Sequence, residues 1–209
     1  MTQLTATEIL DAAVELLDRG PAALTMRALA DRLEVTSAAL YYWFPSKAHL
    51  MDAIAAHVAA RIVAGESETG SWKVRLKALA VAIREAAVDH PQTFNWVFTN
   101  YASQPPLAKI DEAMVAVLLN AGFTARQALL AKGSVLRFVV GDLGLTQKTE
   151  GDTDTSDLDP VQYPHLSSLC ADDAAIPPKD YLDFGLDRII DGIAAERRRR
   201  MRRPTEAVG

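Results

Sequence analysis

The chain has 209 residues, of which 49% are hydrophobic, enough to bury the core of one medium domain or two small ones. No stretch approaches the roughly 20 consecutive apolar residues of a membrane span, and the N-terminus lacks the basic start and apolar run of a signal peptide. The single cysteine, Cys170, excludes an internal disulfide bond. These features predict a soluble cytoplasmic protein.

The net charge of −5 gives no sign of a nucleic-acid partner. Residues 197–203 hold six of the 22 Lys and Arg residues, so the rest of the chain is more acidic than the total. Residues 1–62 contain five Lys or Arg against seven Asp or Glu, whereas DNA-binding domains usually have a basic excess. Evidence for DNA binding therefore has to come from local motifs.

The N-terminal part of the chain, up to Gly65, predicts four short helices. Thr5 and Glu8 form a capping box ahead of the first helix, and Gly20-Pro21 ends that helix. Residues suited to N-caps precede the next three helices, namely Thr25, Thr36 and Ser46. These helices are expected over residues 26–33, 37–44 and 47–63, and a turn is expected over 65–70.

The second half predicts longer helices and no strands. Ser71 is the expected N-cap of a helix over 72–88, His90-Pro91 marks a new start, and Thr124 with Gln127 forms a second capping box. Further helices are expected over 109–121, 124–145 and 179–200. Residues 147–160 contain five acids and, apart from Leu158, no large apolar residue, which predicts a mobile acidic loop.

The predicted fold class is all-α, with two parts. Residues 1–64 are expected to form an N-terminal helix-turn-helix domain, made of three short helices and the helix over 47–63. Residues 65–203 are expected to form a C-terminal helical bundle for ligand binding and dimerisation, and residues 197–209 form a basic tail. Three interpretations of that tail are open. It is a solvated helix end, a disordered tail or a source of nonspecific DNA affinity.

Residues 25–44 have the plan of a helix-turn-helix, because two short helices are joined by a tight turn and the second begins with small polar residues. The apolar residues that would hold the two helices together are Ala28, Leu29, Leu33, Val35 and Leu40. Small residues let the second helix enter the major groove, where hydroxyls and aromatic edges meet bases and phosphates. A plain helical cap is the alternative, but the consecutive aromatics Tyr41 to Trp43 favour DNA reading.

The stretches Leu24–Leu33 and Val35–Lys47 resemble the DNA-binding domain of the tetracycline-repressor (TetR) family, and the resemblance extends over residues 5–62. In the second half, Tyr163–Leu166 and Phe184–Gly192 resemble the subgroup closest to the tetracycline repressor itself. The resemblance implies an all-helical homodimer that binds DNA and whose C-terminal domain binds an inducer.

The resemblance also implies roles for residues of the motif. Thr25 and Lys47 would hold phosphates, and Arg27 would reach a base edge or the DNA backbone. The full DNA-binding set is Thr25, Arg27, Thr36, Ser37, Ala38, Tyr41, Tyr42, Trp43 and Lys47. Glu34 departs from the family pattern, which has glycine there; a left-handed backbone would cost glutamate on the order of 1 kcal/mol. Trp43 departs from the usual histidine or tyrosine, and its indole can only donate.

The last helix carries an apolar stripe that suits a dimer interface. Its members are Leu182, Leu186, Ile189, Ile190 and Ile193. Packing within the same chain is the alternative, and Gly185 and Gly192 either allow close approach or weaken the helix. A palindromic operator needs two recognition helices about 34–36 Å apart, and a two-fold dimer uses one patch twice. The resemblance implies a four-helix interface formed by this helix, the helix over 124–145 and their copies.

Apolar pockets with a few placed polar groups are the usual ligand sites. The candidate effector residues are Trp96, Asn100, Tyr101, Met114, Phe123, Arg137, Phe138 and His165. Core packing is the alternative for each aromatic. An unpaired charge at Arg137 would be costly to bury, so this residue either forms an ion pair, with Asp142 or with an acid across the dimer, or meets an anionic ligand. No two of the four histidines stand one helical turn apart, so neither a metal nor a cofactor is expected.

The sequence therefore predicts a ligand-responsive repressor that binds palindromic operator DNA as a homodimer. An unknown small-molecule effector would tilt the helix over 47–63 and release the DNA. The alternative is a helical small-molecule-binding protein with weak or lost DNA binding, which Glu34, Trp43 and the acidic excess over residues 1–62 favour. An enzyme is not predicted, because no nucleophile–base pair, helically spaced carboxylate pair or glycine-rich phosphate loop stands out.

Overall fold

The structure is a computed structural model that describes residues 4–66, 69–101, 105–146, 159–167 and 176–202. The chain separates into two compact units, residues 1–129 and residues 130–209. All regular structure in the described ranges is helical, which confirms the predicted all-α fold class. Most of the predicted acidic loop, residues 147–158, lies outside the described residues, as does the end of the basic tail from residue 203.

The described part of the first unit holds seven complete helices and the start of an eighth. They are α1 (Ala6–Leu17), α2 (Met26–Arg32), α3 (Ser37–Trp43), α4 (Lys47–Ala64), α5 (Trp72–Asp89), α6 (Pro91–Tyr101), α7 (Pro105–Asn120) and α8 (Ala125–Thr146). The predicted boundaries agree within two residues except at α7. That helix begins at Pro105 rather than at residue 109, because proline is well tolerated in the first turn of a helix.

The predicted capping groups explain where most of these helices begin. The Thr5 and Thr124 capping boxes both form, with the threonine oxygen accepting from the third helical N–H and the Glu8 or Gln127 side chain accepting in return. Thr25, Thr36 and Ser46 each accept a backbone N–H as predicted. Ser71 differs, because its backbone is extended as in an N-cap but its hydroxyl makes no capping bond.

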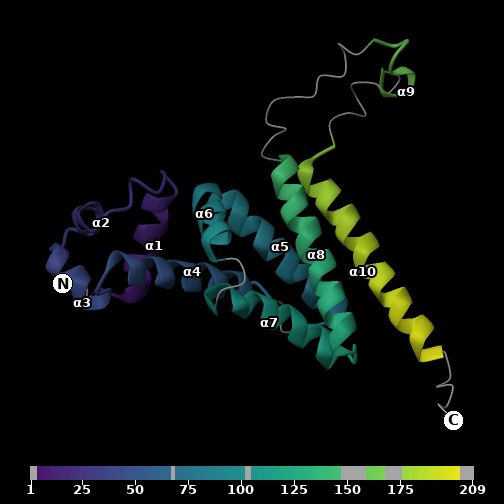
Figure 1. The fold of residues 1–209 in the computed structure, drawn as a ribbon, viewed down its shortest axis with the longest axis horizontal. Coiled ribbons are helices and arrows are strands. Elements are labelled where there is room, and N and C mark those ends of the chain that lie inside the picture. The colour runs from purple at the N-terminus through teal and green to yellow at the C-terminus, as the bar shows by residue number, and fades with distance from the viewer. Residues whose placement is uncertain (1–3, 67–68, 102–104, 147–158, 168–175, 203–209) are drawn as a thin grey trace. The chain divides into compact units, whose positions relative to one another are not determined.

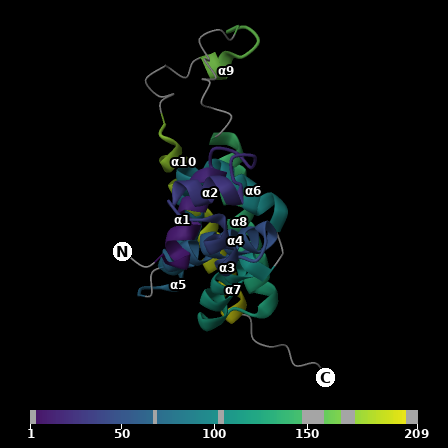
Figure 2. The same ribbon diagram turned by 90° about the vertical axis from the view of Figure 1, so that its left-hand side faces the viewer.

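The long helix α4 is the centre of the first unit. It packs against α1, α5, α6 and α7, and Figures 1 and 2 show α1, α2 and α3 gathered around its N-terminal half. Burying each large aliphatic side chain contributes about 1.5–3 kcal/mol. The largest fully buried side chains of the unit are Ile9, Leu17, Leu24, Leu29, Leu40, Leu50, Ile54, Ile62, Leu76, Leu79, Ile83 and Met114.

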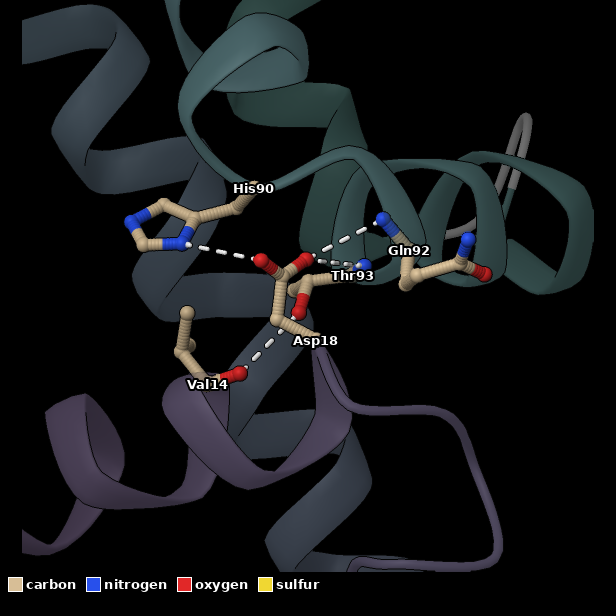
Figure 3. A network of polar contacts seen from close by, with 5 residues as sticks. All are labelled: Val14, Asp18, His90, Gln92 and Thr93. Carbon is tan, nitrogen blue, oxygen red and sulfur yellow. Dashed lines mark hydrogen bonds and ion pairs between the residues drawn. The ribbon is translucent and has the colours of Figure 1, made fainter.

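A polar contact joins α1 to the first turn of α6 (Figure 3). The Asp18 carboxylate, at the C-terminal end of α1, accepts the backbone N–H groups of Gln92 at 3.1 Å and Thr93 at 3.2 Å. The Thr93 hydroxyl donates to the Val14 carbonyl at 3.2 Å, and Thr93 is fully buried. The first turn of a helix has N–H groups without helical partners, so Asp18 caps α6 from another helix.

The second unit contains the rest of α8, a short helix α9 (Pro164–Ser167) and α10 (Pro178–Arg202). α10 runs alongside α8, and a Cβ at Gly185 would overlap the ring of Phe138. Gly185 is therefore a point of close approach between the helices. α10 continues through Arg202, so this part of the basic segment is helical. Its contribution to nonspecific DNA affinity stays a prediction. In the described ranges no helix is long and apolar enough to cross a membrane.

Replacing Asp18 with alanine is expected to lower the free energy of unfolding by about 1–2 kcal/mol, because two N–H groups of α6 lose their acceptor. Urea denaturation followed by circular dichroism measures the change. Asp31→Ala is the matched control, since its carboxylate is exposed and lies 4.0 Å from Arg27; it should change the value by less than about 0.5 kcal/mol. Equal stabilities for the two variants would contradict the capping role of Asp18.

Candidate nucleic-acid interface and effector region

The pair α2–α3 forms the predicted helix-turn-helix. Leu29 and Leu40 are fully buried where the two helices pack, and Ala28, Leu33 and Val35 are half-buried. The pair is held to α1 by Leu24 and Leu29 in the core and by an ion pair of 2.8 Å between Arg32 and Glu15. These apolar residues hold α2 and α3 together, as the sequence predicts. Because Leu40 faces the core, the opposite face of α3 is exposed to solvent.

The outward face of α3 is aromatic. Tyr42 has 86% of its surface exposed, Tyr41 and Trp43 are also exposed, and the Tyr42 and Trp43 rings meet edge to face with centroids 6.4 Å apart. A contiguous exposed patch of aromatic side chains often marks an interaction site. At the start of the helix, Ala38 is exposed and Ser37 is half-buried. Both side chains are small, so the first turn of α3 is sterically accessible.

The capping threonines keep a hydrogen-bond donor for a phosphate. The Thr25 oxygen accepts the Ala28 N–H at 3.0 Å and the Thr36 oxygen accepts the Ala39 N–H at 3.2 Å. Because a hydroxyl both accepts and donates, the hydrogen of each remains available. Both threonines are exposed, as are Arg27, whose side chain is near Asp31, and Lys47 at the start of α4.

Glu34 adopts the left-handed backbone that its position predicts, with φ at 55°. α2 ends there in a Schellman motif, in which the Val35 N–H donates to the Ala30 carbonyl at 3.0 Å and the Glu34 N–H to the Asp31 carbonyl at 3.4 Å. Glycine is the usual residue at this position because it has no Cβ. In the described residues Glu34 is the one non-glycine residue with positive φ.

The predicted effector residues of the first unit divide between core and surface. Met114 and Phe123 are buried, and Phe123 meets Trp72 edge to face at 4.9 Å. Trp96 is half-buried, and the exposed Asn100 donates from Nδ2 to the Trp96 carbonyl at 2.8 Å. The side chain of Tyr101 lies outside the described residues. Packing thus accounts for Met114 and Phe123 in the unliganded chain.

The remaining effector candidates belong to the second unit. Arg137 donates from Nη1 to the Gly133 carbonyl, one turn earlier in α8, at 3.0 Å. The missing side chain of Gly133 makes room for that guanidinium. Phe138 lies against Gly185, and His165 is exposed in α9. The Arg137 side chain is exposed to solvent, so the burial cost that argued for an ion pair or an anionic ligand does not arise.

The predicted dimer stripe on α10 is mostly covered by its own chain. Leu182, Leu186 and Ile190 are buried, while Ile189 and Ile193 are half-buried. The neighbouring apolar residues Tyr181 and Phe184 are exposed instead, and Phe184 has 69% of its surface accessible. The Arg188 guanidinium lies over the Phe184 ring, 5.4 Å from its centroid. Helical spacing identified the helix, but the most exposed apolar residues are next to the predicted ones.

Sequence reasoning missed the contacts that surround Asp18. His90 places Nδ1 at 3.8 Å from the Asp18 carboxylate, and His57 on α4 bonds to Asp11 on α1 at 2.8 Å. A hollow of about 150 Å³ lies beside them, between α1, α4, α5 and α6, and none of the eight predicted effector residues lines it. No local signal marks these groups, because the contact of Asp18 with Thr93 joins residues 75 positions apart.

Two family models match the chain. Residues 9–54 match the model described as bacterial regulatory proteins, tetR family. Residues 64–197 match the model of the tetracycline repressor-like C-terminal domain, which spans more than half of the chain.

The chain belongs to the TetR family. Like its relatives, it is a transcriptional regulator with a DNA-binding helix-turn-helix, and it is not an enzyme.

Individual relatives agree with this assignment. A regulator of Saccharopolyspora erythraea is 32% identical over 67% of this chain and 60% of its own length. The class G tetracycline repressor of Vibrio anguillarum is 30% identical over 92% of this chain and 94% of its own. The crystal structure of a TetR variant from Acinetobacter baumannii in complex with minocycline has a TM-score of 0.62 and 28% identity, and it covers 93% of this chain and 99% of its own.

Among the described residues, no group of three or more His, Cys, Asp or Glu side chains has the arrangement of a metal site. The expectation that this family member works without a metal or cofactor stays a prediction.

Replacing Glu34 with glycine is expected to raise the free energy of unfolding by about 1 kcal/mol, because the left-handed backbone then carries no Cβ. Chemical denaturation measures the gain. Glu34→Gln is the matched control, since it removes the charge and keeps the strained backbone, and it should leave stability within about 0.5 kcal/mol. A glycine variant no more stable than the glutamine variant would show that φ at this position carries no strain.

Proposed function

We propose that this TetR-family protein is a cytoplasmic repressor that binds palindromic operator DNA as a homodimer and leaves it when a small-molecule effector binds. The exposed aromatic face of α3 carries the proposal. That face is built on a helix fixed by buried Leu40, and three consecutive aromatic residues point away from the core. We assign DNA binding to residues 1–64, and effector binding and dimerisation to residues 65–203.

In this proposal the nine predicted residues share the work on DNA in two ways. Thr25, Thr36 and Lys47 hold phosphates, which gives affinity without sequence preference. Tyr41, Tyr42 and Trp43, with Arg27 and the small residues Ser37 and Ala38, meet base edges in the major groove. The segment 1–62 has an acidic excess, so electrostatic attraction contributes less than in basic DNA-binding domains. Specific contacts by α3 must therefore supply more of the binding free energy.

The exposed apolar side chains of α8 and α10 support the homodimer. Tyr181 and Phe184 on α10, and Leu130, Val140 and Leu145 on α8, are all exposed in the single chain. A second copy that covers these residues would bury them by two-fold symmetry, as a closed dimer requires. In this arrangement Leu182, Leu186 and Ile190 hold α10 in place, and Ile189 and Ile193 reach the edge of the interface.

The contacts of α4 and α6 support a route from effector to DNA. α4 begins directly after α3 and packs against α5, α6 and α7. α6 is fixed to α1 by Asp18 and Thr93. An effector that moves the first turn of α6 or tilts α4 would therefore shift α1 and α3. Such coupling is limited by the difference in effector affinity between the two states.

The minocycline complex of the Acinetobacter relative supports an effector site in the second half of this chain. In the first unit we propose Trp96, Met114 and Phe123 as apolar effector contacts and Asn100 as a polar one, with Tyr101 as a further candidate. In the second unit we propose Phe138 as an apolar contact and Arg137 and His165 as polar ones.

Gel-shift titration with the DNA upstream of the protein's own gene tests the proposal. Specific, salt-sensitive binding that an effector reverses supports it, and minocycline is a first effector to add. Absence of specific binding would favour the second candidate, a helical small-molecule-binding protein that has lost its operator, which Glu34 and the acidic excess over the segment 1–62 still favour.

Replacing Tyr42 with alanine is expected to weaken operator binding by roughly tenfold to a hundredfold, since a good base contact contributes about 1–3 kcal/mol. Fluorescence anisotropy with a labelled operator measures the change. Tyr163→Ala is the matched control, because this tyrosine is also exposed but lies in the second unit. Equal weakening by both variants, or by neither, would contradict recognition through α3.

Replacing Phe184 with aspartate is expected to convert the dimer to a monomer, because each two-fold interface would lose two apolar rings and would have to bury two charged groups in their place. Light scattering coupled to gel filtration measures the mass. Val161→Asp is the control, since Val161 is an exposed apolar residue of the same unit outside α10. The Phe184 variant should also lose operator binding. A Phe184→Asp dimer of unchanged mass would place the interface elsewhere.

A further inference from the structure

The hollow between α1, α4, α5 and α6 has an apolar floor. Val14 from α1, Val58 and Ile62 from α4 and Phe94 from α6 line it, and all four are buried in the surrounding core. Its volume of about 150 Å³ matches an apolar protein cavity that holds one benzene molecule. The space is therefore sufficient for a single ring with a short substituent.

Two carboxylates stand at the rim of this hollow. Glu85 and Asp89 lie one turn apart on α5, so their side chains project from the same face. Both are exposed, and within the described ranges neither forms an ion pair. Sequence reasoning did not single out this helically spaced pair. Arg61 from α4 also borders the hollow, so the three charges sum to a single negative charge.

The other polar groups at the hollow are already engaged. The Thr93 hydroxyl donates to the Val14 carbonyl, and the His90 ring faces the Asp18 carboxylate (Figure 3). These contacts hold one wall of the hollow in place. The groups left to recognise a ligand are the Glu85 and Asp89 carboxylates and the Arg61 guanidinium. The two carboxylates outnumber the one cation, and they attract a positively charged ligand and accept its hydrogen bonds.

We propose that this hollow is a binding site for a small amphipathic monoamine. The apolar body of the ligand lies against Val14, Val58 and Phe94, and its ammonium group lies between Glu85 and Asp89. One positive charge neutralises the net charge of the rim. A carboxylate in the same position would meet two like charges, and an uncharged group would leave the two exposed carboxylates to water and gain no charge-assisted hydrogen bond from them.

This site differs from the effector site proposed above, because it is lined by none of the eight effector residues. It does not rest on the proposed function. A ligand here would contact α1 and α4 at once, and would therefore bind the helices that carry the helix-turn-helix to α5 and α6.

Isothermal titration calorimetry of the full chain near neutral pH tests the site, with 2-phenylethylamine as the probe. 2-Phenylethanol and phenylacetate serve as the uncharged and anionic analogues. We expect saturable binding of the amine, and binding of each analogue at least about tenfold weaker, the loss expected when a charge-assisted hydrogen bond is not made. An alcohol that binds as tightly as the amine, or an amine that does not saturate, would overturn the proposal.

Variants locate the binding. Glu85→Gln combined with Asp89→Asn should weaken amine binding at least about tenfold, and Ala86→Leu, which fills the hollow from α5, should abolish it. Glu112→Gln removes an exposed carboxylate from α7 and should leave binding unchanged. Thermal unfolding confirms that each variant is folded.

Tyr42→Ala should bind the amine as the parent does, so loss of operator binding does not bear on this site. Unchanged amine binding in the double carboxylate variant would show that the amine lies elsewhere.

Discussion

The Asp18 carboxylate joins α1, on which the helix-turn-helix packs, to the first turn of α6. Asp18 ends α1 and caps α6, and the buried Thr93 hydroxyl adds a bond to the same turn of α1. A negative charge also suits the positive end of a helix dipole. α1 in turn packs on α2 and α4. The first turn of α6 is therefore one of the points, together with α4, that fix the position of the helix-turn-helix.

The surroundings of α1 combine an apolar core with polar contacts at its edge. The core around α4 is aliphatic and fully buried, and such packing resists small displacements. The contacts between α1 and the neighbouring helices α4 and α6 include polar bonds and two histidine–carboxylate pairs at the edge of that core. Polar contacts near solvent exchange with water at low net cost. α1 itself contributes Ile9 and Leu17 to this core, so apolar packing and the polar contacts at its edge together hold it in place.

Local signals predicted most of the fold. Thr5, Thr25 and Thr36 mark helix starts because each caps residues within three positions, and Glu34 occupies a left-handed position that the turn requires. Contacts over long sequence distances were not predictable. Nothing near Asp18 indicates Thr93, and the Glu85–Asp89 pair gains significance only when α1 and α6 enclose the hollow. Helical spacing found the stripe on α10, but spacing cannot say whether the same chain or a copy covers it.

The fit of Gly185 against Phe138 links two properties that protein engineers usually treat as separate. Phe138 is a candidate effector residue, and its ring occupies the space that any side chain at position 185 would need. Trimming Phe138 to admit a larger drug in a biosensor would open a gap beneath the helix that carries Phe184. Enlarging Gly185 would push the ring away. Libraries that vary position 138 should therefore vary position 185 at the same time, and should be sorted for assembly as well as for response.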